Sequence, residues 1–327
     1  VYKRQLDTDP GHDDAFAIFM AIASSEDLDL KAITTVAGNV PLDKTTYNAL
    51  RLRELVEATD VPIYRGCSRP MVNELVTAEY VHGETGLDGP RLPEPTQGVE
   101  SAHAVDYLVD RLLSAEDRSI TVCLIGPLTN MVMALVKEPS IAAKIDEIVI
   151  MGGSFKEGGN ITPTAEFNIY VDPHAAHVVL TSGVPITIMP LDMTHQAQAT
   201  PPRVAGFRSL AAPIGEVVGA MLDFVEQFDV SHHGFAGFPL HDPTVIAYLL
   251  EPEIFEPRSA YVSVVTDAGE THGQTVADWF GQNGREPNAQ VMMSLDADRF
   301  FALVTERLSR FASPQPDPIE TGQAPPR

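Results

Sequence analysis

The chain has 327 residues, of which 44% are hydrophobic, so it can bury the core of one large α/β domain or of two smaller ones. Its net charge is -23, from 45 acidic and 22 basic residues, and so acidic a chain repels phosphate backbones, which argues against a nucleic-acid polymer as partner. No apolar run reaches membrane-spanning length, and VYKRQLD at the N-terminus has no signal-peptide apolar core, so we expect a cytoplasmic protein with no membrane partner. Cys67 and Cys123 form no metal-binding spacing, and Cys123 lies in an apolar run that predicts a core position.

In chain order, a short and unusually polar first strand, VYKRQL, leads into the acidic turn DTDPGHDD. The run AFAIFMAIA that follows is apolar all round and predicts a buried helix. Further strands are predicted in the β-branched runs LKAITTVAG, VPIYRG, ITVCLIG, EIVIMGG, VPITIMPLD and AYVSVV. Helical patterns over Leu42–Ala58, Ala102–Ala115 and Asp172–Ser182 separate several of them.

This alternation predicts one large α/β domain over residues 1–312, in which helices flank both faces of a mostly parallel, mixed central sheet of Rossmann-like design. The tail SPQPDPIETGQAPPR, residues 313–327, is rich in proline and polar residues and is predicted to be disordered. In such sheets, ligands bind at the carboxyl ends of the strands. Polar or glycine-rich segments follow five of the predicted strands, which places a site at that edge.

The acidic turn holds Asp7, Asp9, Asp13 and Asp14 within eight residues. Helix capping explains one or two of them, because helix N-termini favour negative charge. Like charges this close destabilise one another, so either some are protonated or a cation lies among them. Oxygen ligands of this kind favour Mg²⁺ or Ca²⁺.

The acidic turn also resembles two other kinds of site. The spacing D-x-D-x-G-x-D resembles the first half of an EF-hand, but the glycine is misplaced and position twelve is Ile18 instead of glutamate. Asp7-Thr8-Asp9 also fits loosely the nucleophile pair of a Mg²⁺-dependent phosphatase with Asp7 as nucleophile. We keep this phosphatase as a lesser alternative.

Two later segments add polar side chains. In PLHDPTVIAYLL, Asp242-Pro243 has the pattern of a helix N-cap followed by its first residue, with His241 just before it. In GGNITPTAEFNIYVDPHAA, Asn160, Glu166 and Asn168 suit a hydroxyl-rich ligand, because amides and carboxylates exchange hydrogen bonds with hydroxyl groups. Asp172-Pro173 has the same helix-start pattern, and we expect Asp172 to be structural.

Taken together, the segments DTDPGHDDAFAI, TTVAGN, HGETG, GPLTN, MGG, AEFNIYVDPHAA and PLHDP resemble the nucleoside hydrolase family, the inosine–uridine-preferring ribonucleoside N-glycosidases. They occur in family order over roughly residues 7–250. The resemblance implies one Ca²⁺ ion held by Asp9, Asp14, Asp242 and the backbone carbonyl of Ile125. It implies a ribose site formed by Asp13, Asn39, Met151, Asn160, Glu166 and Asn168. His82 and His241 would flank the base, and Asp7 would support the metal ligands.

The resemblance also implies a reaction, the calcium-dependent hydrolysis of the N-glycosidic bond of ribonucleosides to base and ribose in nucleoside salvage. Asp9 would activate a water molecule that attacks an oxocarbenium-like ribosyl centre directly, with inversion, and His241 would protonate the leaving base. Relatives imply a homodimer or homotetramer. A non-catalytic nucleoside-binding protein on the same scaffold is the alternative from another class.

Base preference is expected to depend on residues 221–238, where Gln227, Phe228, His232 and His233 are candidates. The lone Trp279 lies outside the motifs, whereas purine-specific relatives use an active-site tryptophan. His82 and His241 instead suit a base-nonspecific or pyrimidine-preferring enzyme.

Overall fold

The computed structural model describes residues 2–232 and 234–311, so the tail predicted to be disordered lies outside the described residues. Within the described part, nine strands form one sheet in the order β10-β9-β11-β6-β5-β4-β1-β2-β3. Neighbours from β3 to β11 pair in parallel, and β9 and β10 add an antiparallel edge, so the predicted mostly parallel, mixed sheet is confirmed. The strands of this sheet are β1 (Tyr2–Thr8), β2 (Leu28–Thr35), β3 (Ile63–Arg65), β4 (Ile120–Leu124), β5 (Ile145–Met151), β6 (Ile186–Met189), β9 (Phe255–Val264), β10 (Thr275–Asp278) and β11 (Ala289–Leu295). A separate short pair joins β7 (Gln198–Ala199) to β8 (Phe238–Pro239).

The helices include the three predicted from pattern and the buried one predicted after the acidic turn. They are α1 (His12–Ala23), α2 (Leu42–Leu55), α3 (Glu79–His82), α4 (Ala104–Leu113), α5 (Thr129–Lys137), α6 (Phe167–Val171), α7 (Pro173–Leu180), α8 (Leu191–Thr194), α9 (Pro201–Arg208), α10 (Ile214–His232), α11 (Pro243–Leu250) and α12 (Ala297–Ser309). None of the described helices combines the length and hydrophobicity needed to cross a bilayer.

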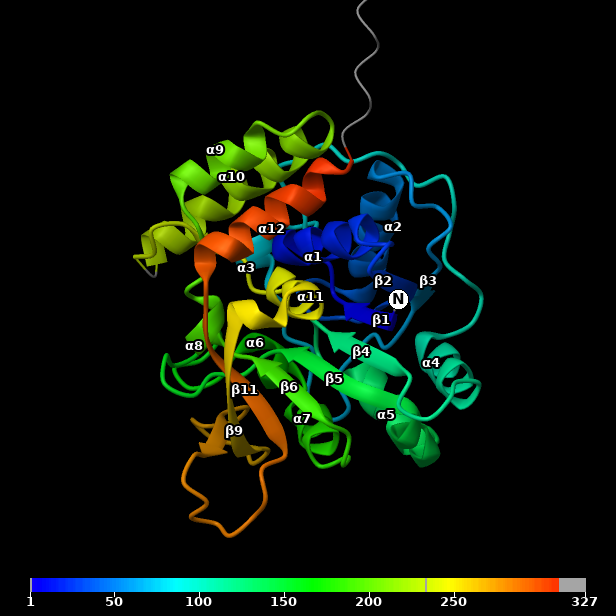
Figure 1. The fold of residues 1–327 in the computed structure, drawn as a ribbon, viewed down its shortest axis with the longest axis vertical. Helices are drawn as coiled ribbons and strands as arrows, with labels where there is room; N and C mark the ends of the chain where they lie inside the picture. Colours follow the sequence, from blue (N-terminus) through cyan, green and yellow to red (C-terminus); the bar gives the residue numbers. More distant parts are fainter. Residues whose placement is uncertain (1, 233, 312–327) are drawn as a thin grey trace, which may run out of the picture.

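Helices cover both faces of the sheet, as predicted (Figure 1). On one face α1, α2 and α9–α12 share a core with inward side chains such as Cys123 and Val149. On the other face α4, α5 and α7 pack on Val122, Leu124 and their neighbours. The alternation along β4 follows from the pleat of a strand, in which successive side chains point to opposite faces. The helix α1 lies inside the first core, where its residues are buried from its first turn through Ala21.

The polar first strand is the central strand of the fold, between β4 and β2. Its polar side chains are tolerated there because they have partners: Arg4 donates to the Thr121 hydroxyl at 2.7 Å and Gln5 to the Thr34 hydroxyl at 3.3 Å. From β1 the chain proceeds to β2 and β3 on one side and then to β4, β5 and β6 on the other. The crevice between the carboxyl ends of β1 and β4 is therefore the topological switch point, where ligands bind in open α/β sheets.

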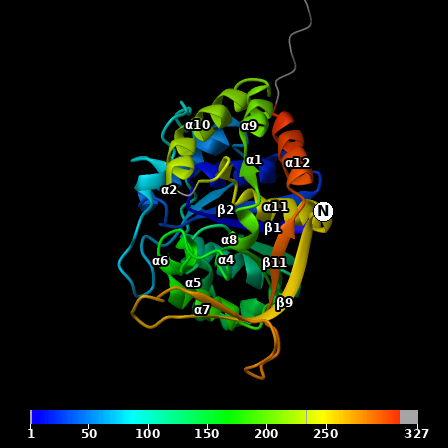
Figure 2. The same cartoon turned by 90° about the vertical axis from the view of Figure 1, so that its left-hand side faces the viewer.

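In the C-terminal part the predicted strand AYVSVV falls in β9, whereas β10, β11 and α12 were not predicted from the sequence patterns. Strand β9 lies between β10 and β11 at the far edge of the sheet and pairs with both in antiparallel fashion. Helix α12 follows β11 and packs against α1 and α11. Figure 2 shows β9 and β11 side by side, with the connecting loops extending from the body. The Thr275 hydroxyl at the start of β10 bonds the backbone of Ser154, so this arm braces the loop after β5.

Asp172 has the structural role expected of it. One carboxylate oxygen caps α7 by accepting from Ala175 N at 3.0 Å. The other accepts from the Thr129 hydroxyl at 2.7 Å and from Met71 N at 2.9 Å. This fully buried carboxylate thereby joins α5, α7 and the loop after β3.

We therefore predict that Asp172→Ala lowers the free energy of unfolding by about 2 to 3 kcal/mol, because it removes a helix cap and leaves buried donors unpaired. Asp172→Asn keeps a carbonyl oxygen for the cap and should lose less. Urea unfolding of both variants measures the difference, and a wild-type midpoint for Asp172→Ala would contradict the role.

Candidate active site

A pocket lies at the carboxyl ends of the central strands, where the sequence predicted a site. It brings together ten of the predicted residues: Asp13, Asn39, His82, Ile125, Met151, Asn160, Glu166, Asn168, His241 and Asp242. The two remaining predicted residues, Asp9 and Asp14, lie next to these side chains and are fully buried. The order of the strands explains the convergence, since residues that follow β1, β2, β4 and β5 meet at one edge.

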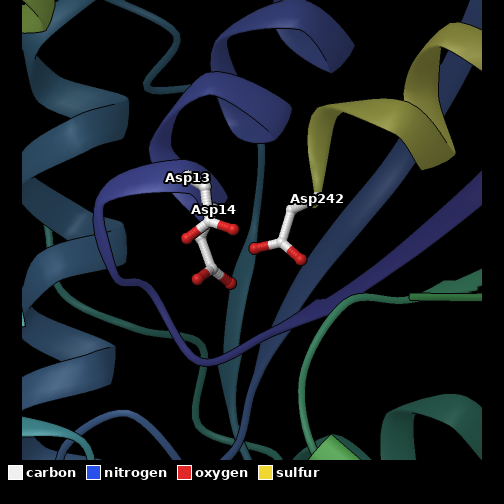
Figure 3. Close-up of side chains that lie close together, drawn as sticks. All are labelled: Asp13, Asp14 and Asp242. Carbon is white, nitrogen blue, oxygen red and sulfur yellow. The ribbon is translucent and has the colours of Figure 1, made fainter. Parts of the chain in front are cut away.

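Three carboxylates form a cluster beside this pocket. Asp13 and Asp14 project from the first turn of α1, and Asp242 approaches from the start of α11 (Figure 3). One oxygen from each lies within 4.8 Å of the others. Asp242 occupies the N-cap position of α11, as its sequence pattern predicted, but its side chain makes no capping hydrogen bond. The carboxylate faces the cluster instead.

Asp14 is held by donors on both of its oxygens. Oδ1 accepts from the Thr8 hydroxyl at 2.5 Å and from Asp9 N at 3.3 Å. Oδ2 accepts from Gly11 N at 2.9 Å and from the Asn39 side-chain amide at 3.2 Å. The bond to Gly11 caps α1, so capping accounts for one of the four acids, as the sequence analysis allowed. These contacts fix the carboxylate in one orientation.

Asp9 is enclosed between two glycines. A Cβ atom on Gly38 would lie 2.0 Å from Asp9 Oδ2, and one on Gly126 would lie 2.4 Å from Oδ1. Asn39 N donates to Oδ2 at 2.7 Å. Oδ1 is buried and has no hydrogen-bond partner among the described residues. This oxygen therefore has lone pairs available for a ligand.

The electrostatics of the cluster call for a positive charge. Burial, followed by repulsion from neighbouring carboxylates, holds the pKa of Asp9 and of Asp242 well above the usual range. Burial also raises the pKa of Asp14, although its hydrogen bonds oppose the shift. Because an oxygen of Asp14 and one of Asp242 lie within 4.8 Å of each other, the two carboxylates repel each other when both are ionised, unless a proton or a cation lies between them. The pocket-lining residues of the described chain include no lysine or arginine to compensate the charge.

Two asparagine side chains turn acceptors toward the pocket. The Asn39 amide donates to the Asp9 carbonyl and to Asp14, both at 3.2 Å. The Asn168 amide donates to the carbonyls of Ile125 at 3.3 Å and of Met151 at 3.2 Å. No described residue donates to the side-chain carbonyl of either asparagine. Together with the carboxylates, they make this part of the pocket rich in acceptors, which suits a ligand that donates from hydroxyl groups.

Glu166 and Asn160 shape the opposite wall. The Glu166 carboxylate caps α6, where it accepts from Asn168 N at 2.9 Å, and it also accepts from Gly153 N at 3.0 Å. Burial nevertheless raises the pKa of Glu166 to about 7. Asn160 accepts from Phe167 N at 2.9 Å through its carbonyl, which leaves its amide hydrogens to the pocket.

Histidines and aromatic rings line the outer part of the pocket. His241 Nδ1 lies 2.7 Å from the Thr194 hydroxyl. His195 packs at 4.8 Å from Phe235 and at 5.8 Å from His241. The sequence analysis missed His195 and Phe235 as pocket residues. The only signal for His195 was its position just after the strand that ends in Leu191-Asp192.

His82 lines the pocket from α3 and is in contact with His12, which the sequence analysis also missed. The two Nδ1 atoms are 3.1 Å apart. Burial lowers the pKa of His12 to about 4, and burial together with the neighbouring His12 and His241 holds the pKa of His82 well below its usual range. Burial therefore favours the neutral form of both rings.

Asp7 does not reach the pocket. It is fully buried at the end of β1, where Oδ1 accepts from the Thr34 hydroxyl at 2.5 Å and from the Asn130 amide at 2.7 Å. Asn130 also accepts from Cys67 N, so Asp7 ties β1 to β2, α5 and the loop after β3. A substrate phosphate has no path to this carboxylate, so the geometry removes the basis for the phosphatase alternative.

The remaining candidates lie elsewhere. The side chains of Gln227, Phe228, His232 and His233 are outside the described residues. Trp279 packs edge-on to Phe155 at 5.5 Å and is not among the residues that line the pocket, as the sequence analysis expected.

Comparisons with known proteins match this chain, over nearly its whole length, to nucleoside hydrolases. A sequence model of the family described as "Inosine-uridine preferring nucleoside hydrolase" matches residues 5–302. The pyrimidine-specific ribonucleoside hydrolase RihA of Enterobacter sp. (strain 638) is 46% identical over 308 residues, which cover 94% of this chain and 97% of that protein. Two solved structures each give a TM-score of 0.87. They are a purine-preferring ribonucleoside hydrolase from Gardnerella vaginalis, at 30% identity over 94% of this chain and 98% of that one, and a plant nucleoside hydrolase, at 32% identity over 94% and 99%.

The buried Glu166 generates a pH prediction. Its pKa is about 7 in the fold against an ordinary 4.5, so between these pH values the native state binds more protons than the unfolded chain. The free energy of unfolding therefore falls as pH rises through this window. We expect the fall between pH 5 and pH 7 to be about 2 kcal/mol smaller in Glu166→Gln than in the wild type.

Urea unfolding at both pH values, in buffer with chelator, measures this difference. Glu216→Gln makes the same change on an exposed position of α10 and should leave the fall unaltered. An unaltered fall in Glu166→Gln would show that the Glu166 carboxyl is not protonated in the fold.

Proposed function

The chain belongs to the inosine-uridine preferring nucleoside hydrolase family and is a ribonucleoside N-glycosidase, and from this premise we propose a calcium-dependent reaction with a preference for pyrimidine nucleosides. In this reaction water cleaves the N-glycosidic bond and yields ribose and free base. The observation that carries the substrate assignment is the acceptor-rich inner pocket. Its carboxylates and two asparagine carbonyls match the hydroxyl donors of a ribose.

The site fits a hard divalent cation. The unpartnered Asp9 Oδ1 and the close approach of the Asp14 and Asp242 carboxyl groups both call for positive charge, and no described pocket-lining residue is a lysine or arginine. Asp9, Asp14, Asp242 and the Ile125 carbonyl would hold Ca²⁺, with Asp13 as an adjacent carboxylate. A bound Ca²⁺ ion would supply Lewis-acid activation of water at this position.

We assign the other steps to residues of the chain. Asp9 would take a proton from the attacking water through Oδ1, since Oδ2 already accepts a hydrogen bond from the backbone N–H of Asn39. Asp13, Asn39 and Asn168 would orient the ribose hydroxyls, and Asn160 and Glu166 the 5′-hydroxyl. The surrounding carboxylates would stabilise the positive charge that develops on the sugar. Direct attack by water gives inversion at C1′.

His241 is our proposed acid for the leaving base. It faces the outer pocket, where aromatic side chains suit a planar base, and the Thr194 hydroxyl holds its Nδ1. A histidine can donate a proton near neutral pH, which a departing nucleobase needs. Met151 would pack against the sugar and His82 would contact the base.

The pyrimidine preference is supported by the 46% identity to a hydrolase named pyrimidine-specific, against 30% for one named purine-preferring. Ribose release from uridine, cytidine, inosine, adenosine and guanosine tests it directly. Comparable rates across the panel would instead support a base-nonspecific enzyme. We also propose a homodimer or homotetramer, which size-exclusion chromatography with light scattering tests.

Asp9→Asn is expected to lower kcat for ribose release by about 10²- to 10⁴-fold, since it removes the proposed general base. Asp110→Asn makes the same charge change on the exposed surface of α4 and should retain wild-type turnover. If Asp9→Asn turns over like the wild type, the catalytic assignment fails. If the wild type binds nucleosides without releasing ribose, a non-catalytic binding protein is the better account.

Chelation by EDTA is expected to abolish ribose release, and added Ca²⁺ to restore it. Ca²⁺ should also raise the unfolding temperature of the wild type, because a ligand that binds only the native state stabilises it. Asp242→Asn should weaken that thermal shift, whereas Asp110→Asn should preserve it. Full activity in EDTA would contradict a metal-dependent mechanism.

A further inference from the structure

His12 belongs to the acidic turn but has no part in the reaction as derived so far. Its ring is 1% exposed and lies against His82, whose ring reaches the pocket. The two rings are nearly parallel, with centroids 5.4 Å apart and planes at 16°. His12 also stacks on Phe224 of α10, at 5.3 Å and 12°. Packing on both neighbours fixes the plane of the His12 ring.

The hydrogen-bond partners determine which nitrogens carry hydrogen. His12 Nε2 lies 2.8 Å from the carbonyl oxygen of Asp88, and a carbonyl can only accept, so His12 Nε2 is protonated. A neutral His12 then has a bare Nδ1. This atom is 3.1 Å from His82 Nδ1, and two bare nitrogens do not bond, so His82 Nδ1 carries the hydrogen. The Nε2 atom of His82 is left as an acceptor.

A competing arrangement exists in the same geometry. The backbone N–H of His12 is 3.3 Å from His82 Nδ1 and could donate to it. His82 would then carry its hydrogen on Nε2, and His12 would need hydrogens on both ring nitrogens to avoid two bare atoms in contact. A charged imidazolium is costly at a site this buried, where, among the described residues, the one ring hydrogen-bond partner outside the histidine pair is a neutral carbonyl. The neutral chain is therefore favoured.

We propose that His12 is a positioning residue that fixes His82 as the Nδ1–H tautomer, so that His82 Nε2 accepts a hydrogen bond from the nucleoside. No described residue bonds His82 Nε2, and the ring lines the pocket, so this lone pair faces the ligand. The donor is either an N–H group of the base or an O–H group of the sugar. The inference deepens the proposed function and rests on it for the identity of the ligand. It gives His82 and His241 opposite roles, with His82 as acceptor and His241 as donor.

The first test reads the tautomer without any turnover. Long-range ¹H–¹⁵N correlation of ¹⁵N-histidine-labelled protein, with His82 assigned through His82→Gln, should show a protonated Nδ1 and an unprotonated Nε2. Saturating uracil and saturating ribose are then added separately. A shift of His82 Nε2 with uracil identifies a base donor, and a shift with ribose identifies a hydroxyl donor. A protonated Nε2 in the free protein, or no shift with either compound, overturns the proposal.

The second test uses matched variants. His12→Phe keeps an aromatic ring for stacking but has no acceptor, so His82 should lose its fixed tautomer and kcat/KM for uridine should fall about 10- to 100-fold, as for other partners that orient a histidine. His12→Asn can place its amide carbonyl near the former Nδ1, and it should preserve the His82 tautomer and lose less activity. Phe224→Leu removes the stacked ring and should keep the tautomer. Equal losses in His12→Phe and His12→Asn, with the His82 tautomer unchanged in both, would reduce His12 to a packing residue.

Failure of the proposed function and failure of the His82 assignment give different results. If the wild type releases no ribose from any nucleoside, the proposed function is wrong, while the tautomer of His82 is still read by NMR. If ribose is released but His82 carries its hydrogen on Nε2, the hydrolase stands and the inference falls.

Discussion

The mutual repulsion of carboxylates buried at the N-terminus of α1 is the constraint on which the site depends. Asp14 is tolerated because hydroxyl, backbone and amide donors surround it. Asp9 and Asp242 have no such set of donors, and their raised pKa values express the cost of burying them. Folds retain such a cost of burying carboxylates where function requires it. A bound divalent cation would offset the repulsion and would make the cluster a metal site.

The polar groups around the cluster follow from this constraint. The side-chain amides of Asn39 and Asn168 donate to an acid and to backbone carbonyls, whereas Asn160 keeps its amide hydrogens for the pocket. What remains for a ligand is a set of acceptors on the inner side and rings on the outer side. A nucleoside matches both environments, because its ribose can donate hydrogen bonds to the inner acceptors while its planar base packs against the outer rings.

The sequence predicted much of this arrangement, because its signals were local. Strand-ending motifs such as Asp7–Asp14 and Asn39 identify the edge of a parallel sheet, and helix starts such as Asp242-Pro243 are visible in the chain itself. The residue pattern alone made Asp242 a helix cap, and only the family resemblance placed it with Asp14; the resemblance assigned Asp13 to the ribose, and its grouping with Asp14 and Asp242 was not predicted. Nor could the sequence show His12 and His82 in contact, since no periodicity encodes a contact between turns so far apart. Of the C-terminal elements only β9 was predicted, from AYVSVV; β10, β11 and α12 were missed because their patterns are short or amphipathic and their pairing is long-range.

The position of Asp242 has a consequence for biosynthesis. The central strand β1 and the acids of α1 are made first, but β4 pairs with β1 only after the intervening strands have been synthesised, and Asp242 joins near the end. During translation, the acids of α1 are therefore part of an incomplete sheet until Asp242, their partner in the cluster, has been synthesised. A nascent chain that stops before α11 therefore has the first acids of the site but lacks Asp242, and it cannot complete the cluster.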